Sequence, residues 1–576
     1  MNGRRLVGAA LDRTYAHPRL RVLLREAWGI GRTAAVRSGM PHVLEPPEFE
    51  DLRRLRSALE GTAARTADAP RVLFLSMRGW STHLMYETVL AHAVRRRGSE
   101  PVFATCGGRL PICDIVPGEA APPMPCHSCR QYATGALTAG GFEALELRDV
   151  VDVGVETALA RKRIAQISTV AQCEAFEHDG LAIGRLVRVS TAWFLSRGSL
   201  PEEPLVRRTY RRFLVSGMVV AAAFRRLLEQ VRPRRVFLLN GSFFAERILR
   251  AIAEGAGIPV VTYEKGFLLD TLLVTEGAAA CDLEVGDAAW RSAATISLSE
   301  EENRMLDEYL DERTRGGRTF DSFWVENRDD IATIRAELAL EPGRRLAVLF
   351  SNILWDSAVQ DKEVTFASMP EWVIEAVRWV SQRPDVDLVL RLHPAEVKLA
   401  NHPTRERMSD VLSAAFAAMP ANVRIIQPES TISSYRLMEI ADVGLVYTST
   451  VGLEMACLGH PVVTAGAVHY RGRGFTIDPG DAQTWRAAID LVLDDPPDPT
   501  DRAATRDLAR RYANLFFFQF HQAWSLIHEE GRSRPRLLAT DAASIAPGAD
   551  PVLDRIAGHV LSGRGPLVTP RSRAER

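Results

Sequence analysis

The segment Val443-Gly-Leu-Val-Tyr-Thr-Ser-Thr-Val-Gly-Leu-Glu454 joins an apolar run to a polar turn and the start of a helix. Its first four residues are apolar, as expected for a strand buried on both faces of a parallel sheet. The polar turn Tyr447–Thr450 follows, and a helix is expected to begin at Val451 or Gly452. Strand, turn and helix in this order form the repeating unit of a doubly wound α/β sheet.

The same unit recurs in two series along the chain. In the second half, five apolar runs alternate with helical patterns, which argues for a parallel sheet. The expected strands there are 346–350, 386–390, 423–426, 443–446 and 461–464, and the expected helices lie near 370–382, 404–418, 433–441 and 451–458. In the first half, strands are expected at 71–76, 101–104, 235–240 and 259–263, and helices at 83–97 and 244–256. We therefore predict an α/β protein with two doubly wound Rossmann-type domains and a cleft between them.

This pattern divides the chain into five parts. We predict an N-terminal basic helical segment over 1–65, a first Rossmann-like domain over 66–289, a polar connection over 290–335, a second Rossmann-like domain over 336–530 and a partly disordered tail over 531–576. Leu20, Leu23, Leu24 and Trp28 recur at helical spacing, with arginines between them. They fit a surface helix that packs on the first domain, or a basic helix that rests on an anionic membrane surface.

Charge and hydropathy exclude several classes of protein. The 576 residues carry a formal net charge of −1, which does not favour a nucleic-acid binder. No apolar run reaches the roughly 20 residues that a transmembrane helix needs, and the first residues lack the features of a signal peptide. We expect a cytoplasmic protein, with peripheral contact at the inner face of the plasma membrane as an additional option.

Ligands of open α/β sheets bind beyond the carboxyl ends of the strands. Arg391-Leu-His-Pro394 follows the strand that ends at Leu390. Pro394 disfavours helical geometry at His393, whose imidazole could donate to a phosphate or a leaving oxygen. Arg391 could add a charge-assisted contact to the same group. A histidine that only ties down the turn is the alternative.

The turn at 447–450 is a second candidate for phosphate binding. Ser449 and Thr450 would add hydroxyl donors to the free N–H groups of a helix start, and Gly452 would let a ligand approach closely. An ordinary Ser/Thr helix cap is the alternative. Glu454 could complement the helix dipole or accept hydrogen bonds from a ribose diol.

The loop His469–Thr476 follows the next strand and contains Tyr470 and Arg471 between glycine and aromatic residues. Arginine in a flexible loop suits phosphate recognition, although an exposed loop without a ligand has the same composition. Three polar segments thus follow three strands of one predicted sheet, which favours a shared binding edge.

These motifs carry a resemblance to a known family. Arg391-Leu-His-Pro394, Tyr447–Glu454, Gly459-His-Pro-Val-Val463 and His469–Thr476 resemble the capsule polysaccharide biosynthesis family, which includes Kdo (3-deoxy-manno-octulosonate) transferases and has the GT-B fold. The resemblance covers 340–480 strongly and 230–280 moderately. It implies that His393 contacts the donor phosphate and that Ser449 and Thr450 lie beside it. Similar motifs occur in sialyltransferases that use CMP-sugars and in CDP-glycerol transferases, so the donor stays open, with a CMP-sugar favoured.

The first half offers an acceptor side. Tyr263-Glu-Lys-Gly266 resembles the acidic-x-Gly motif of bacterial sialyltransferases, which implies that Glu264 is the general base. Inverting transfer needs such a group near the acceptor hydroxyl, although Glu264 could also be a loop carboxylate paired with Lys265 or an arginine. His83, Asn240 and Gly266 follow neighbouring strands and are candidates for acceptor binding.

Four cysteines cluster in the first half, at Cys106, Cys113, Cys126 and Cys129. Structural zinc, an iron–sulfur cluster and unliganded thiols all fit this spacing, since four soft ligands suffice for a tetrahedral site. No metal is expected in catalysis, because arginine, histidine and a helix start would neutralise the phosphate.

The predicted function is transfer of a sugar, Kdo or a related acidic sugar by the resemblance, from a nucleotide donor to a capsular or surface polysaccharide or a lipid-linked acceptor. Two alternatives remain. One is a CDP-glycerol-type polyol-phosphate transferase, and the other is a non-catalytic subunit of a polysaccharide assembly or export complex.

Overall fold

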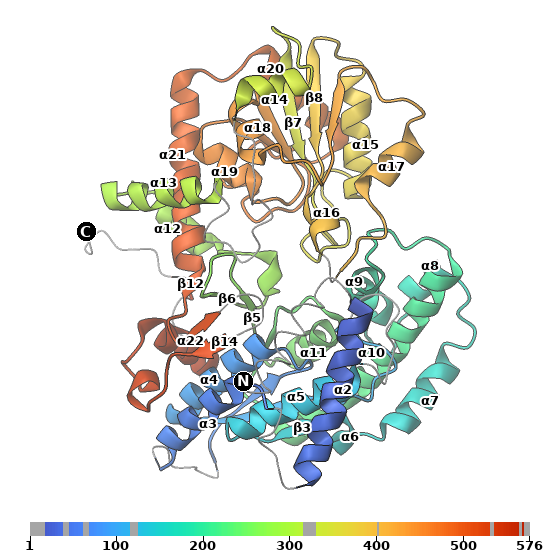
Figure 1. Cartoon of the computed structure of the whole chain (residues 1–576), viewed down its shortest axis with the longest axis vertical. Coiled ribbons are helices and arrows are strands. Elements are labelled where there is room, and N and C mark those ends of the chain that lie inside the picture. Colours follow the sequence, from blue (N-terminus) through green and yellow to red (C-terminus); the bar gives the residue numbers. More distant parts are fainter. Residues whose placement is uncertain are drawn as a thin grey trace.

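A computed structural model describes residues 18–38, 45–61, 68–115, 125–314, 330–399, 402–529, 535–563 and 567–568. Two sheets organise it, one in the lower and one in the upper half of Figure 1. The first sheet has the strand order β12-β6-β5-β4-β1-β2-β3, and its five strands from β5 to β3 are parallel. These strands are β1 (Arg71–Leu75), β2 (Glu100–Thr105), β3 (Ala144–Glu146), β4 (Arg235–Leu239) and β5 (Val260–Lys265).

Apolar clusters cover both faces of the first sheet. This is expected because successive residues of each parallel strand point to opposite faces and are mostly apolar. Leu73 and Leu238 point into one cluster, and Phe74 and Phe237 into the other. The flanking helices are α4 (Ser81–Arg96), α5 (Cys126–Ala139), α10 (Pro204–Val231) and α11 (Phe244–Gly255). Between β3 and β4 the chain is almost wholly helical, with α6 (Leu147–Val150), α7 (Val153–Arg163), α8 (Val170–Glu174) and α9 (Ile183–Leu195) preceding α10.

The second sheet is entirely parallel, with the order β11-β10-β7-β8-β9. Its strands are β7 (Arg345–Phe350), β8 (Val386–Arg391), β9 (Val423–Ile426), β10 (Val443–Val446) and β11 (Val462–Thr464). Its helices are α15 (Met369–Val380), α16 (Ala395–Lys398), α17 (Met408–Ala415), α18 (Ser434–Ile440), α19 (Val451–Cys457) and α20 (Ala482–Asp494). The prediction of two doubly wound Rossmann-type sheets is confirmed.

The chain after residue 515 differs from the expectation. Helix α21 (Pro499–Leu515) passes into a π-helical turn, Phe516–Phe520, and the chain then returns to the first sheet. There β12 (Gln522–Ala523) pairs antiparallel with β6 (Thr271–Glu276). The chain therefore leaves the predicted second domain, 336–530, before residue 522, because β12 pairs with the edge of β6 in the first sheet.

The expected partly disordered tail also holds folded structure within the described residues. Within that range, 531–576, β14 (Pro535–Leu537) and α22 (Pro551–Ser562) pack on the first domain beside α4, and β13 (Ile527–Glu529), just before the range, packs there with them (Figure 1). Trp524, Ile527, Ile556 and Val560 join the same apolar cluster as Phe74. Burial of these side chains offsets the ordering of a segment whose composition suggested a loose tail.

The expected connection is helical where the structure describes it. α12 (Asp287–Ala294) and α13 (Glu300–Thr314) pack against α21, and α14 (Ile331–Glu337) precedes the second sheet. Near the N-terminus, α2 (Pro18–Arg37) and α3 (Glu48–Leu59) pack on α5, as a surface helix would, while residues 1–17 lie outside the described part. Among the described helices, none combines the length and apolar character needed to span a bilayer.

Candidate active site between the two sheets

The carboxyl-end loops of the two sheets meet between the domains. The loop after β7 reaches the short 3-10 helix η1 (Ala280–Asp282) of the first domain, where Lys362 Nζ lies 2.6 Å from a carboxylate oxygen of Asp282. Arg247 of α11 pairs with Asp361 of the same loop at 2.8 Å. Burial raises the pKa of the Cys281 thiol well above its usual value, and the charges of Glu264 and Asp356 add to that shift. Loops of the two domains are therefore in direct contact at these two ion pairs. We call the loops at the carboxyl ends of the first sheet the first rim and those of the second sheet the second rim.

Glu264 lies at the carboxyl end of β5, on the first rim. The backbone N–H of Lys265 donates to its Oε1 at 2.8 Å, and Cys281 Sγ lies 3.9 Å from its Oε2. Burial raises the pKa of this carboxyl. The Lys265 amine instead pairs with Glu529 at 2.6 Å. An ion pair between the Glu264 and Lys265 side chains, considered from the sequence, is thus replaced by a backbone contact.

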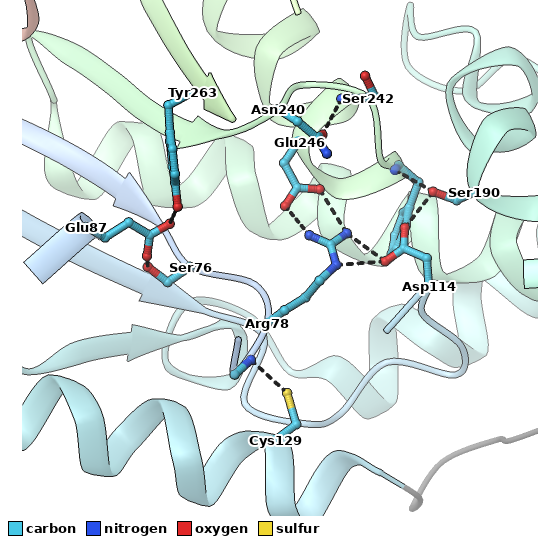
Figure 2. A network of polar contacts seen from close by, with 12 residues as sticks. Ser76, Arg78, Glu87, Asp114, Cys129, Ser190, Asn240, Ser242, Glu246 and Tyr263 are labelled. Atoms are coloured by element: carbon cyan, nitrogen blue, oxygen red, sulfur yellow. Dashed lines mark hydrogen bonds and ion pairs between the residues drawn. The ribbon is translucent and has the colours of Figure 1, made fainter. Parts of the chain in front are cut away.

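A buried carboxyl stands behind this rim. Glu87 of α4 accepts hydrogen bonds from the hydroxyls of Tyr263, at 2.8 Å, and of Ser76. Figure 2 shows the three side chains in a row between β1, α4 and β5. Burial raises the pKa of Glu87 to about 7, so this group changes charge near neutral pH. Because Tyr263 precedes Glu264, the row fixes the end of β5.

Arg78, in the loop after β1, forms a second buried network that the sequence did not single out. Its guanidinium donates to Asp114 at 2.6 and 2.9 Å and to Glu246 at 2.5 and 3.1 Å. Ser190 of α9 donates to the other Asp114 oxygen at 2.6 Å (Figure 2). The network ties the helical region α6–α10 to the sheet. Its only sequence signal is an arginine directly after an apolar strand.

The three predicted acceptor-binding residues, His83, Asn240 and Gly266, lie on the first rim and differ in their surroundings. His83 is half-buried at the start of α4, and burial lowers its pKa to about 3, so the ring is neutral at pH 7. Asn240 adopts a φ of 29° after β4, and its Oδ1 accepts from the Ser242 N–H at 2.8 Å. Gly266 has no room for a side chain, since a Cβ there would lie 1.9 Å from Thr271 Oγ1.

His393 lies on the second rim, after β8. Its backbone N–H donates to Ser351 Oγ at 3.0 Å, and its Nδ1 accepts from the Ala395 N–H at 3.1 Å. Burial lowers its pKa to about 4, so the neutral ring carries its proton on Nε2. Pro394 is the N-cap residue of α16. The arrangement ties down the turn and also leaves the ring in the tautomer that donates from Nε2.

The turn Tyr447–Thr450, which we call the hydroxyl turn, follows β10, and β7 lies between β10 and β8 in the sheet. Ser449 and Thr450 are half-buried, and Ser449 Oγ accepts from the Val451 N–H at 3.3 Å, while Thr450 makes no side-chain cap bond to α19. The Thr448 N–H donates to Asn352 Oδ1 at 3.4 Å. Within the described residues, the buried Thr448 Oγ1 has no hydrogen-bond partner.

Arg391 and Glu454, both predicted to contact the donor, instead bind other groups of the protein. Arg391 is 2% exposed because β8 extends through it, and its guanidinium donates to the carbonyls of Gln427 and Ser430 at 2.8 and 3.3 Å. Glu454 is 1% exposed and pairs with Arg313 of α13 at 3.1 Å. A phosphate contact by Arg391 would break its bonds to these carbonyls, whereas Glu454 keeps an unpartnered Oε2 among the described residues but is closed off by burial.

The loop after β11 contacts the hydroxyl turn through Tyr470. Tyr470 is fully buried, and its hydroxyl donates to the Ser449 carbonyl at 2.6 Å. A Cβ on Gly452 would lie 2.2 Å from that hydroxyl, so Tyr470 requires the glycine. Arg471 donates to Thr464 Oγ1 at 2.6 Å and to the Pro479 carbonyl. Both predicted donor contacts in this loop are therefore supporting residues in the structure.

The four clustered cysteines are free thiols. The Gly79 N–H donates to Cys129 Sγ at 3.2 Å and the Gly108 N–H to Cys106 Sγ at 3.3 Å, and burial raises the pKa of Cys106, Cys113, Cys126 and Cys129. Over the described part of the chain, no three His, Cys, Asp or Glu side chains are grouped so that they could hold a metal ion. The predicted structural zinc is thus not supported.

No protein-family model matches this chain, and no curated protein matches it. Among solved structures, it is similar to a Thermosulfurimonas dismutans KpsC described as a β-Kdo 2,7 transferase, with 14% identity over 50% of this chain and 79% of that chain and a TM-score of 0.29. A KpsC of the same organism, described as a β-Kdo 2,4 transferase, is 12% identical over 57% of this chain and 88% of that chain, with a TM-score of 0.30.

An S. aureus MnaA–UDP structure is 10% identical over 87% of this chain and 100% of that chain, with a TM-score of 0.29. Likenesses at these TM-scores carry no argument for a family or an activity. The fold is established by the topology of the two sheets.

Proposed function

We propose that this chain is a glycosyltransferase that moves a sugar from a nucleotide donor on the second domain to a hydroxyl acceptor on the first. One observation carries the proposal. A half-buried carboxylate, Glu264, lies on a rim that contacts a second rim bearing the His393 imidazole and the hydroxyls of Thr448, Ser449 and Thr450. Carboxylate opposite neutral hydrogen-bond donors is the pairing that acyl, phosphoryl and glycosyl transfer share, and the resemblance of the motifs favours glycosyl transfer.

The rims divide the work of the reaction. Glu264 takes the proton of the acceptor hydroxyl as that oxygen bonds to the anomeric carbon of the sugar. The bond from that carbon to the donor phosphate breaks, and its electron pair goes to the phosphate oxygen. His393 Nε2–H and the hydroxyl turn stabilise the charge that develops there. The products are a glycosylated acceptor and a free nucleotide.

The raised pKa of Glu264 suits this role. A base is most effective when its pKa approaches the working pH, and burial moves Glu264 in that direction. The neutral state of His393 suits the opposite rim, because it can donate a hydrogen bond without placing a fixed charge beside the phosphate. We propose no metal in the transfer step, since the imidazole and hydroxyls supply the donors. Addition of EDTA should then leave the rate unchanged.

The resemblance favours a CMP-linked acidic sugar such as Kdo as the donor and a capsular or lipid-linked glycan as the acceptor. Calorimetric titration with CMP, CDP, UDP and GDP tests this. We expect CMP to bind most tightly. Preference for UDP or GDP would replace the donor class, and absence of binding by all four would contradict the transferase itself.

Thr448→Val supplies a residue-level test of the donor rim. Its Oγ1 has no partner in the described structure, so the isosteric change should leave the free energy of unfolding unchanged or slightly raised. Loss of one hydrogen bond to the donor should weaken CMP binding about tenfold. Thr333→Val, on the exposed start of α14, is the matched control and should bind CMP as the wild type does.

A further inference from the structure

We propose that the C-terminal return of the chain completes a subsite for a neutral sugar ring on the first domain, formed by His83, Lys265 and Gln522. The proposal rests on the proposed function, because the ring bound there would belong to the acceptor. It adds residues from β12 and β13 to a rim that the sequence assigns to the first half of the chain alone.

The strand register places the key side chains on one face of the sheet. Leu272 of β6 pairs with Lys265 of β5 on one side and with Gln522 of β12 on the other. Directly paired residues of antiparallel strands project to the same face. Leu272 lies in the apolar cluster that also contains Tyr263, so Lys265 and Gln522 flank that cluster at the end of β5. The His83 ring lies over the same face, 5.8 Å from the ring of Tyr263.

Glu529 of β13 brings charge balance to this place. Its carboxylate pairs with Lys265 Nζ at 2.6 Å, and the Tyr86 hydroxyl donates to it at 3.5 Å. The amine is thus neutralised by a residue of the returning segment. A balanced pair does not select for an anion, and it offers both donors and an acceptor to hydroxyl groups.

Unmet hydrogen-bonding groups point to a ligand. Gln522 is 2% exposed, and neither its amide nitrogen nor its amide oxygen has a partner among the described residues. The buried Nδ1 of His83 is also without one in that part of the chain. Each such group destabilises the folded protein while it stays unpaired. The set contains both donors and acceptors, and a sugar hydroxyl can satisfy either kind because it donates and accepts.

Aromatic rings lie around the His83 ring. Trp80 lies 5.6 Å from the His83 ring, and Tyr86 lies 6.5 Å from His83 and 5.9 Å from Trp524, between ring centroids. A pyranose has apolar C–H faces and a rim of hydroxyls, so rings beside planar amide, imidazole and carboxylate groups match it on both counts. The charge balance and these rings together favour a neutral hexopyranose.

The test uses the full-length protein, with methyl α-glucopyranoside, methyl β-galactopyranoside and methyl α-mannopyranoside as probes. Saturation-transfer NMR detects their binding. At least one should bind in the millimolar range, which is ordinary for a single sugar ring with few contacts. Gln522→Leu should weaken that binding about tenfold and leave CMP binding unchanged. Gln519→Leu, three residues earlier, is the control, since the Gln519 amide nitrogen bonds to Asn514 instead.

The melting temperature separates the competing explanations. Leucine removes an unpaired buried amide, so Gln522→Leu should melt no lower than the wild type. If its sugar binding equals that of the wild type, ordered waters alone fill the place and the subsite is rejected, as it is if no probe binds the wild type. Should Gln522→Leu fail to fold, His83→Phe keeps the ring packing and must show the same loss. Sugar binding without CMP binding would reject the transferase and keep the subsite.

Discussion

The rims of the two sheets carry different chemistry, although both follow parallel strands of similar composition. The first rim holds ionisable groups whose pKa values burial has moved, with Glu264 in front and Glu87 behind it. The second rim presents a neutral imidazole and hydroxyls, and its arginine Arg391 is turned into the domain. The contrast shows that burial, rather than residue type in a motif, decides which charges reach a ligand.

The largest expected effect comes from the first rim. Glu264→Gln removes the proton acceptor and keeps the shape, so kcat for transfer should fall by about 10²–10⁴. CMP binding belongs to the other rim and should not change. Steady-state rates and calorimetry measure the two. Glu284→Gln, at an exposed position, should keep full activity, and a fully active Glu264→Gln enzyme would remove Glu264 from the reaction.

Arg391→Met tests whether this arginine of the second rim stabilises the fold rather than binding the donor phosphate. The change leaves two buried carbonyls without their donor and a partly filled cavity, which should lower the free energy of unfolding by about 4 kcal/mol. Denaturant titration measures this. If Arg391 only supports the loop, the ratio of CMP affinity to cytidine affinity should stay as in the wild type. A collapse of that ratio would restore the phosphate contact predicted from the sequence.

The buried carboxyl of Glu87, behind the first rim, should make the stability of the protein depend on pH. Its folded-state pKa, about 7, lies above its ordinary value, so the folded protein binds the proton more strongly than the unfolded chain does. Its contribution to stability is therefore complete at low pH and is lost as pH rises through about 7. Glu87→Gln should raise the free energy of unfolding at pH 8 by up to about 3 kcal/mol and change nothing below about pH 4.5.

Denaturant titrations at both pH values give the result, with Glu254→Gln on the exposed side of α11 as the control that should show no difference at either. Equal stability of Glu87→Gln and wild type at pH 8 would mean that the buried carboxyl ionises without cost, contrary to its surroundings.

The smallest effect is expected beneath the hydroxyl turn. Tyr470→Phe removes the hydrogen bond to the Ser449 carbonyl and should cost about 1 kcal/mol of stability. CMP affinity should fall by less than about tenfold, because the phenol supports the turn and does not touch the donor. A loss as large as that of His393→Ala would make Tyr470 a direct contact. Tyr435→Phe, outside this loop, provides the comparison.

Much of this fold was accessible from the sequence because its strands are short apolar runs bounded by polar turns. Val386–Leu390 and Val443–Val446 are examples, and both are strands of the second sheet. The return of the chain was not accessible, because β12 has two residues and no periodicity, and only pairing with β6 defines it.

The site shows the same limit at the level of side chains. The motif places Arg391 and Glu454 at the rim, but their directions depend on partners far away in the sequence. Glu454 meets Arg313, which is 141 residues earlier, and Arg391 meets carbonyls 36 and 39 residues later. Local spacing contains no information on such partners, whereas the turn carrying Ser449 and Thr450 is set locally and was placed correctly next to its strand.

The pairing of β12 with β6 also has a consequence for biosynthesis. On the ribosome, β6 is made long before the strand that covers its edge, since the whole second domain lies between them. During that interval the nascent first domain has an open strand edge and an uncovered apolar face where Trp524, Ile527 and Ile556 will pack. The first domain can thus mature only after the second has been synthesised, which makes the early chain a natural client for chaperones that shield exposed strands.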